Sequence, residues 1–218
     1  MDNPENTEPR RSPVRQPVLL GLFTGTAVGA GYLLAGVSNV ELMTLIAALA
    51  GAALGWPSGA VVGALAAGVY SLGSPFGPPV PILLVAQALG LALAGILGHL
   101  AARPLGNMLA RGRRRTTVIL AGALGGVATL GYDVLTNLAG LAAFDLAPAV
   151  VVTGAVPFVL IHVGTNTVIF GALVPVLLPR LRGLSRSPLT GGGGTAALVL
   201  VASLLLAPGA GAQPAQTS

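Results

Sequence analysis

This sequence contains no cysteine and very few charged residues. The chain has 218 residues, of which only 8% are charged and 54% are hydrophobic. The absence of cysteine excludes disulfides, thiolate zinc sites and cysteine nucleophiles. A typical soluble domain is about 25% charged, so the composition excludes a water-soluble globule and predicts a polytopic membrane protein. Aromatic residues make up 4%, against 32 glycines and 17 prolines, which favours small-residue packing of helices in lipid over an aromatic-girdled barrel.

The sequence also lacks lysine, so that all eleven basic residues are arginines. They fall into three groups, at 10–15, 103–115 and 180–186, and each group flanks a long apolar run. Positive residues that flank membrane spans mark the cytoplasmic side. The net charge of +5 is therefore interpreted as a record of topology, with all three groups inside, and not as a surface for nucleic acid.

Six apolar runs approach the length of about 20 residues that a helix needs to cross a bilayer. We predict spans at 17–36, 41–56, 58–73, 82–102, 116–140 and 149–178. The second and third are short and joined by a tight turn, so they are expected to be tilted or to cross incompletely. The predicted fold class is all-α, with a six-helix membrane domain over 16–182 and both termini inside. The external connections are then 37–40, 74–81 and 141–148.

The two ends of the chain differ from this domain. Residues 1–15 are polar and contain no apolar core, which predicts a disordered cytoplasmic tail and not a secretory signal. Residues 183–195 include four consecutive glycines and are predicted to form a flexible linker. Residues 196–218 contain a short apolar run at 196–207. A short seventh apolar helix and an internal signal-like segment both fit this run.

One acidic residue, Asp133, lies well inside a predicted span, because Glu41, the first residue of the span at 41–56, and Asp145 are assigned to the external connections. An ionisable residue in a span costs about 2.5–3.5 kcal/mol on insertion scales and is a functional candidate by default. Asp133 shares a helix face with the residue four positions later, and a second polar pair has the same spacing in the sixth span. These groups are expected to converge below the external connections. The candidate binding residues are Gln87, Tyr132, Asp133, Asn137, His162 and Asn166.

Three interpretations of these polar residues compete. They form a structural network that holds the last two spans together, or a pocket for a polar solute, or a catalytic acid–base pair of Asp133 and His162. The catalytic interpretation requires these two side chains to lie within hydrogen-bond reach. The sequence contains no His-Glu-x-x-His zinc pattern, no Gly-x-Ser-x-Gly elbow and no P-loop.

Glycines recur every four residues along the first span, at Gly21, Gly25 and Gly29. Such a stripe allows the close approach of another helix. Packing within the chain and contact with a partner subunit both fit this pattern.

Taken together, these features resemble the substrate-specific (S) components of energy-coupling factor (ECF) transporters. The resemblance covers about residues 17–182 and depends on six spans, the proline-rich segment 74–81, Gln87, and the motifs YDVLTN at 132–137 and HVGTN at 162–166. The two polar motifs are its most specific parts.

The resemblance implies a multi-pass protein of the cell inner membrane that is not an enzyme and has no cofactor or metal. It implies a binding site for a vitamin-like solute in the outer half of the lipid-embedded domain. It further implies docking on an ECF coupling subunit that carries two cytoplasmic ATPase subunits. Gly21, Gly25 and Gly29 are the candidate docking contacts, although the family more often has alanine there. The few aromatic residues argue against a pocket that stacks a flat ring on several side chains.

Overall fold

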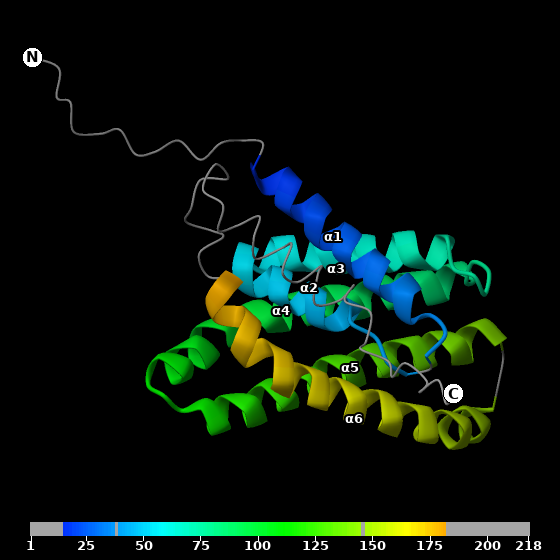
Figure 1. Cartoon of the computed structure of the whole chain (residues 1–218). Coiled ribbons are helices and arrows are strands. Elements are labelled where there is room, and N and C mark those ends of the chain that lie inside the picture. Colours follow the sequence, from blue (N-terminus) through cyan, green and yellow to red (C-terminus); the bar gives the residue numbers. More distant parts are fainter. Residues whose placement is uncertain (1–14, 38, 145–146, 182–218) are drawn as a thin grey trace, which may run out of the picture.

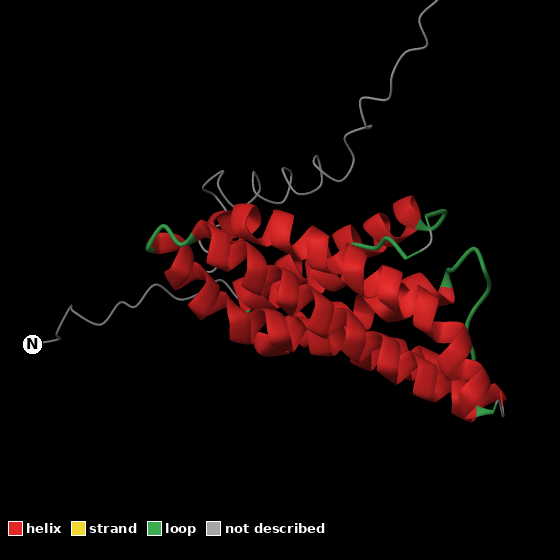
Figure 2. Cartoon of the chain, turned by 90° about the horizontal axis from the view of Figure 1, so that it is seen from below, coloured by secondary structure: helices red, strands yellow, loops and turns green. Residues whose placement is uncertain are grey.

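The computed structural model describes residues 15–37, 39–144 and 147–181. This part of the chain is helical throughout, without strands, and its elements are joined by short connections (Figures 1 and 2). The helices are α1 (Arg15–Leu34), α2 (Met43–Leu54), α3 (Trp56–Leu72), α4 (Pro81–Ala110), α5 (Arg114–Phe144) and α6 (Pro148–Leu181). The predicted tail at 1–14, the linker at 183–195 and the segment 196–218 lie outside the described residues.

Four of the helices, α1, α4, α5 and α6, are long and apolar enough to cross a membrane. The remaining two are shorter, as the sequence predicted. With 12 and 17 residues, α2 and α3 extend about 18 and 26 Å at 1.5 Å per residue, less than the roughly 30 Å of a hydrocarbon core. The length and composition of the four long helices suggest a membrane protein.

The shortest helix, α2, lies at the centre of the bundle. Ten of its 12 residues are buried, and it packs against α1, α3, α4 and α6. A helix that is apolar on all sides is found in a protein core or in a membrane, and the burial of α2 places it in the core. The second predicted span is therefore a core helix surrounded by its neighbours.

Two boundaries differ from the prediction. Arg15, assigned to the disordered tail, begins α1. The predicted arginine loop at 103–115 is reduced to a turn, because α4 continues through Arg103 and Pro104 to Ala110. Gly112 has a φ of 71° in this turn, a backbone conformation that glycine adopts without steric cost. With 30 and 31 residues, α4 and α5 are about 45 Å long, longer than the roughly 30 Å of a hydrocarbon core.

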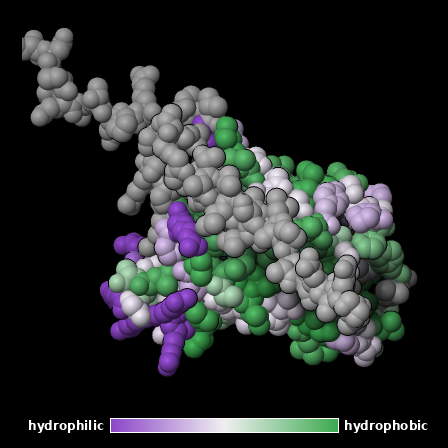
Figure 3. Space-filling model, in the orientation of Figure 1, coloured by the Kyte–Doolittle hydropathy of each residue, from purple (hydrophilic) through white to green (hydrophobic). Residues whose placement is uncertain are grey.

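The two ends of the bundle differ in character. The α1–α2 and α3–α4 connections lie together at one end, and the α4–α5 turn lies at the other (Figure 1). Arg111, Arg113, Arg114 and Arg115 are exposed at the α4–α5 turn, where the space-filling view shows the strongest hydrophilic colour (Figure 3). The charge of the described residues is thus concentrated at the end away from the two connections.

Glycines bring α2, α3 and α4 into direct backbone contact. A Cβ added at Gly51 of α2 would collide with the backbone of Gly95 in α4, and one added at Gly95 would collide with Gly59 in α3. Gly63 of α3 lies in the same way against the backbone of Leu91 in α4. These three helices pack through small residues, as expected for helices whose association in lipid depends on close van der Waals contact.

We expect Gly63→Ala to destabilise the protein, because its methyl group would push α3 away from the α4 backbone. Overpacking of this kind costs about 1–3 kcal/mol, and each kcal/mol lowers Tm by about 2–4 °C in a chain of this size. The matched control is Gly68→Ala on the same helix, where an added Cβ meets nothing within 4 Å. Thermal unfolding in detergent should show a loss of Tm for the first variant and no loss for the second. Equal Tm values would contradict the packing account.

Candidate functional site

A cavity of about 230 Å³ opens at the end of the bundle that holds the α1–α2 and α3–α4 connections. Residues from the α1–α2 connection and from all six helices line it. Its polar and aromatic lining residues are Asn39, Glu41, Thr44, Tyr70, Ser71, Gln87, Tyr132 and His162. Three of the six predicted binding residues, Gln87, Tyr132 and His162, are among them.

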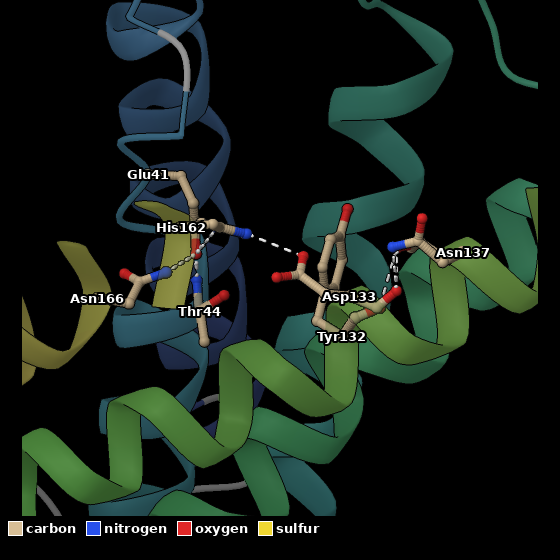
Figure 4. Close-up of polar contacts among 8 residues, drawn as sticks. Glu41, Thr44, Tyr132, Asp133, Asn137, His162 and Asn166 are labelled. Atoms are coloured by element: carbon tan, nitrogen blue, oxygen red, sulfur yellow. Dashed lines mark hydrogen bonds and ion pairs between the residues drawn. The ribbon is translucent and has the colours of Figure 1, made fainter. Parts of the chain in front are cut away.

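Glu41 anchors this site from the α1–α2 connection. Its Oε2 accepts a hydrogen bond from the backbone N–H of Thr44 at 2.9 Å, in the first turn of α2, where the helix dipole also favours a negative charge. Its Oε1 accepts a hydrogen bond from Nδ2 of Asn166 at 3.0 Å and lies 3.7 Å from Nε2 of His162. The connection is therefore tied to α2 and to α6 through one carboxylate (Figure 4).

His162 lies between two carboxylates. Its Nδ1 is 2.9 Å from Oδ1 of Asp133 on α5, and its Nε2 faces Glu41. The two ring nitrogens thus face different acids, and the imidazole joins α5 to the α1–α2 connection (Figure 4). The ring of Tyr132 stands edge-on to the imidazole, with 6.2 Å between the ring centroids.

Gln87 forms the other polar side of the cavity. Its Oε1 accepts a hydrogen bond of 2.8 Å from the hydroxyl of Ser71, so α3 holds the amide of α4 in place. Tyr70, the neighbour of Ser71, packs its ring against Tyr32 with 5.1 Å between centroids. The cavity therefore combines fixed polar groups with two lining tyrosines, Tyr70 and Tyr132.

The remaining predicted residues have different positions. Asn166 is fully buried and supports Glu41 without lining the cavity. The amide of Asn137 donates to the backbone carbonyl of Asp133 in its own helix and is not part of the lining. The predicted network in which Asp133, Asn137, His162 and Asn166 bind one another is thus limited to the Asp133–His162 contact.

Sequence reasoning assigned Glu41 to an external connection and did not include it among the candidate binding residues. The structure places Glu41 in the α1–α2 connection, beside the same imidazole as Asp133. An acid three residues before Thr44, at the start of an apolar helix, matches the pattern of a helix N-terminus. That pattern predicts the contact with α2, but it carries no information on the contact with α6.

Among the described residues, no group of three or more His, Asp or Glu side chains is arranged to hold a metal ion. The structure therefore gives no support for a metal site in this part of the chain. The catalytic interpretation meets its distance requirement, because Asp133 and His162 are 2.9 Å apart. Both imidazole nitrogens nevertheless face carboxylates.

The glycine stripe of α1 lies on the outside of the bundle. Gly21, Gly25 and Gly29 are exposed, and a Cβ added at any of them would meet nothing within 4 Å. The stripe therefore does not serve packing within the described part of the chain.

The pKa of Glu41 lies below its ordinary value of 4.5. Burial works against ionisation, but the contacts with His162 and Thr44 outweigh it. A depressed pKa in the folded state stabilises the protein above the unfolded-state pKa, and this contribution is lost as the pH falls through the folded-state pKa. We expect Tm to drop below about pH 4.5 in the wild type, and the drop to be smaller in Glu41→Gln. Thermal unfolding between pH 3 and 7 measures this, and parallel curves for both proteins would contradict it.

Comparison with protein-family models, curated proteins and solved structures finds no match.

Proposed function

We propose that this chain is the solute-binding (S) component of an ECF-type importer, which captures a vitamin or related micronutrient from outside the cell inner membrane. In this proposal all six helices form one multi-pass domain, with the N-terminus and the end of α6 in the cytoplasm. A coupling subunit with two cytoplasmic ATPase subunits drives transport. The chain itself binds and releases the solute and catalyses no reaction.

The observation that carries the proposal is the position and lining of the cavity. The α1–α2 connection, which contributes to its lining, lies at the end of the bundle away from the arginine-rich α4–α5 turn (Figure 1). Because arginines mark the cytoplasmic side, the cavity opens outward, where an importer must bind its solute. Among its polar groups, Glu41, Gln87 and His162 are each held by a partner, as is typical of small-molecule sites.

Two other interpretations have less support. A purely structural role for the polar residues does not account for the open cavity of about 230 Å³ beside them. Acid–base catalysis would need a ring nitrogen of His162 to reach a substrate. The carboxylates of Glu41 and Asp133 lie next to the two ring nitrogens and block this access.

The proposal is tested by calorimetric titration of the purified chain with a panel of water-soluble vitamins of different charge. The panel contains thiamine, pyridoxamine, pyridoxine, riboflavin, biotin and pantothenate. We expect one compound to bind with submicromolar affinity and Asp133→Ala to weaken it at least about tenfold, because that variant releases His162 from its position. Binding no tighter than micromolar for every compound, or binding that Asp133→Ala leaves unchanged, would reject the proposal. Asn137→Ala, adjacent on α5 but away from the cavity, is the matched control.

A further inference from the structure

We infer that the cavity takes a small organic cation that carries N–H donors, such as a protonated amine, an amidinium or a guanidinium. This inference rests on the proposed function for the view that the cavity holds a solute, and adds the chemical class of that solute. Three independent properties of the site support it: its charge, the unpaired hydrogen-bond acceptors beside it and its aromatic lining.

The charge of the site is negative in either state of the histidine. Glu41 and Asp133 together contribute two negative charges, and His162 between them contributes at most one positive charge. Among the described residues no arginine lines the cavity, and the chain has no lysine. A cation that enters the cavity therefore meets an unbalanced negative charge, which a low-dielectric surrounding strengthens.

Two buried hydrogen-bond acceptors beside the cavity are unpaired. The Oδ2 of Asp133 and the Oδ1 of Asn166 are buried and have no hydrogen-bond partner among the described residues. Asp133 is 7% exposed and Asn166 is 0% exposed, so bulk water does not satisfy them. Each belongs to a residue in direct contact with a lining residue, His162 or Glu41. A ligand that donates N–H groups to Glu41 would free Asn166 and His162 to pair with other acceptors, so that fewer acceptors remain unpaired. An anionic ligand would bring further acceptors and no donors.

Glu41 is the group that meets the ligand. Its side chain is 23% exposed and lines the cavity, whereas Asp133 lies behind His162 and acts through it. Tyr70 and Tyr132 also line the cavity, and the faces of aromatic rings attract organic cations. A metal ion fits less well, because the two carboxylates contact different nitrogens of one imidazole and so do not converge on one point.

A set of three probes isolates the charge of the ligand from its size and shape. Benzamidine, benzamide and benzoate share one ring and carry a positive, a neutral and a negative group. At millimolar concentration we expect benzamidine to raise the Tm of the full-length chain by about 2–5 °C, as mass action predicts for a weak ligand present above its Kd. Benzamide and benzoate should change it by less than about 1 °C. An equal or larger shift with benzoate, or no shift with any probe, would overturn the inference.

Two isosteric substitutions change the charge of the cavity in opposite directions. Glu41→Gln should remove the benzamidine shift, because the neutral amide still accepts from Thr44 but carries no charge. Gln87→Glu should increase the shift, because the new carboxylate still accepts from Ser71 and adds a negative charge. If Glu41→Gln does not fold, Gln87→Glu alone decides, and a reduced shift in that variant would overturn the inference.

The same data separate this inference from the proposed function. A shift selective for benzamidine, with no vitamin bound in the calorimetric panel, supports the cation site and rejects the importer. Tight binding of a neutral or anionic vitamin supports the importer and rejects the cation site. Within the panel, pyridoxamine should bind more tightly than pyridoxine, because the two differ by an amine in place of a hydroxyl group.

Discussion

Replacing His162 with alanine is expected to cause the largest loss of stability of any single substitution in the polar site. The imidazole lies between Asp133 and Glu41, and its removal leaves two largely buried carboxylates without their common partner. Removing one member of a buried charged group typically costs about 3–5 kcal/mol, which corresponds to a Tm lower by roughly 10–15 °C. Thermal unfolding in detergent at pH 7 measures this loss.

The matched control for His162→Ala is His99→Ala, since His99 is the second of the two histidines in the chain and is exposed on α4. That substitution should leave Tm within about 1–2 °C of the wild type, as is usual for surface positions. A Tm equal to that of the wild type at pH 7 would show that the imidazole does not hold the site together.

Gly25→Leu is expected to abolish co-purification with an ECF coupling subunit while leaving solute binding intact. Gly25 is the middle residue of the exposed stripe on α1, and its surroundings within the chain are empty. A leucine there fits without disturbing the fold, but it would keep a partner helix from the close approach that the stripe allows. Affinity purification of the assembled complex, followed by calorimetry on the isolated variant, measures both properties.

Gly164→Leu provides the control for added bulk on a different face. Gly164 is exposed on α6 and also has nothing within 4 Å of an added Cβ, so this variant should retain the complex. Loss of the complex in both variants would indicate a general effect of bulk at the lipid surface. Retention in both would exclude the stripe as the docking contact.

Much of the fold was predictable, because long apolar runs interrupted by prolines and arginines leave few alternatives to helices. The shortness of α2 and α3 followed directly from the spacing of the breaks. The extension of α4 through Arg103 and Pro104 was not predictable. An arginine marks the end of a span but not the end of a helix, and a proline inside a helix is disfavoured.

The site was predictable in part. Residues four positions apart on a helix share a face, which placed His162 and Asn166 together on α6. Whether a polar side chain points to its own backbone, as Asn137 does, or across to a neighbour depends on the rotation of the helix. The contact of Glu41 with α6 joins residues 125 positions apart in the chain, and no local pattern encodes it. The sequence also did not show that the α1 glycines face outward, because this too depends on the rotation of the helix in the bundle.

The measurement that tests the central claim most directly is uptake of a labelled panel vitamin by a bacterial host that lacks its own importers for the panel. The host would express this chain with or without a coupling subunit and its two ATPases. The account predicts accumulation only when the chain and an active module are both present, and a strong reduction with Glu41→Gln, which removes the negative charge that Glu41 presents to the cavity. Uptake that does not depend on the chain, or no uptake of any panel vitamin by a folded and assembled complex, would contradict it.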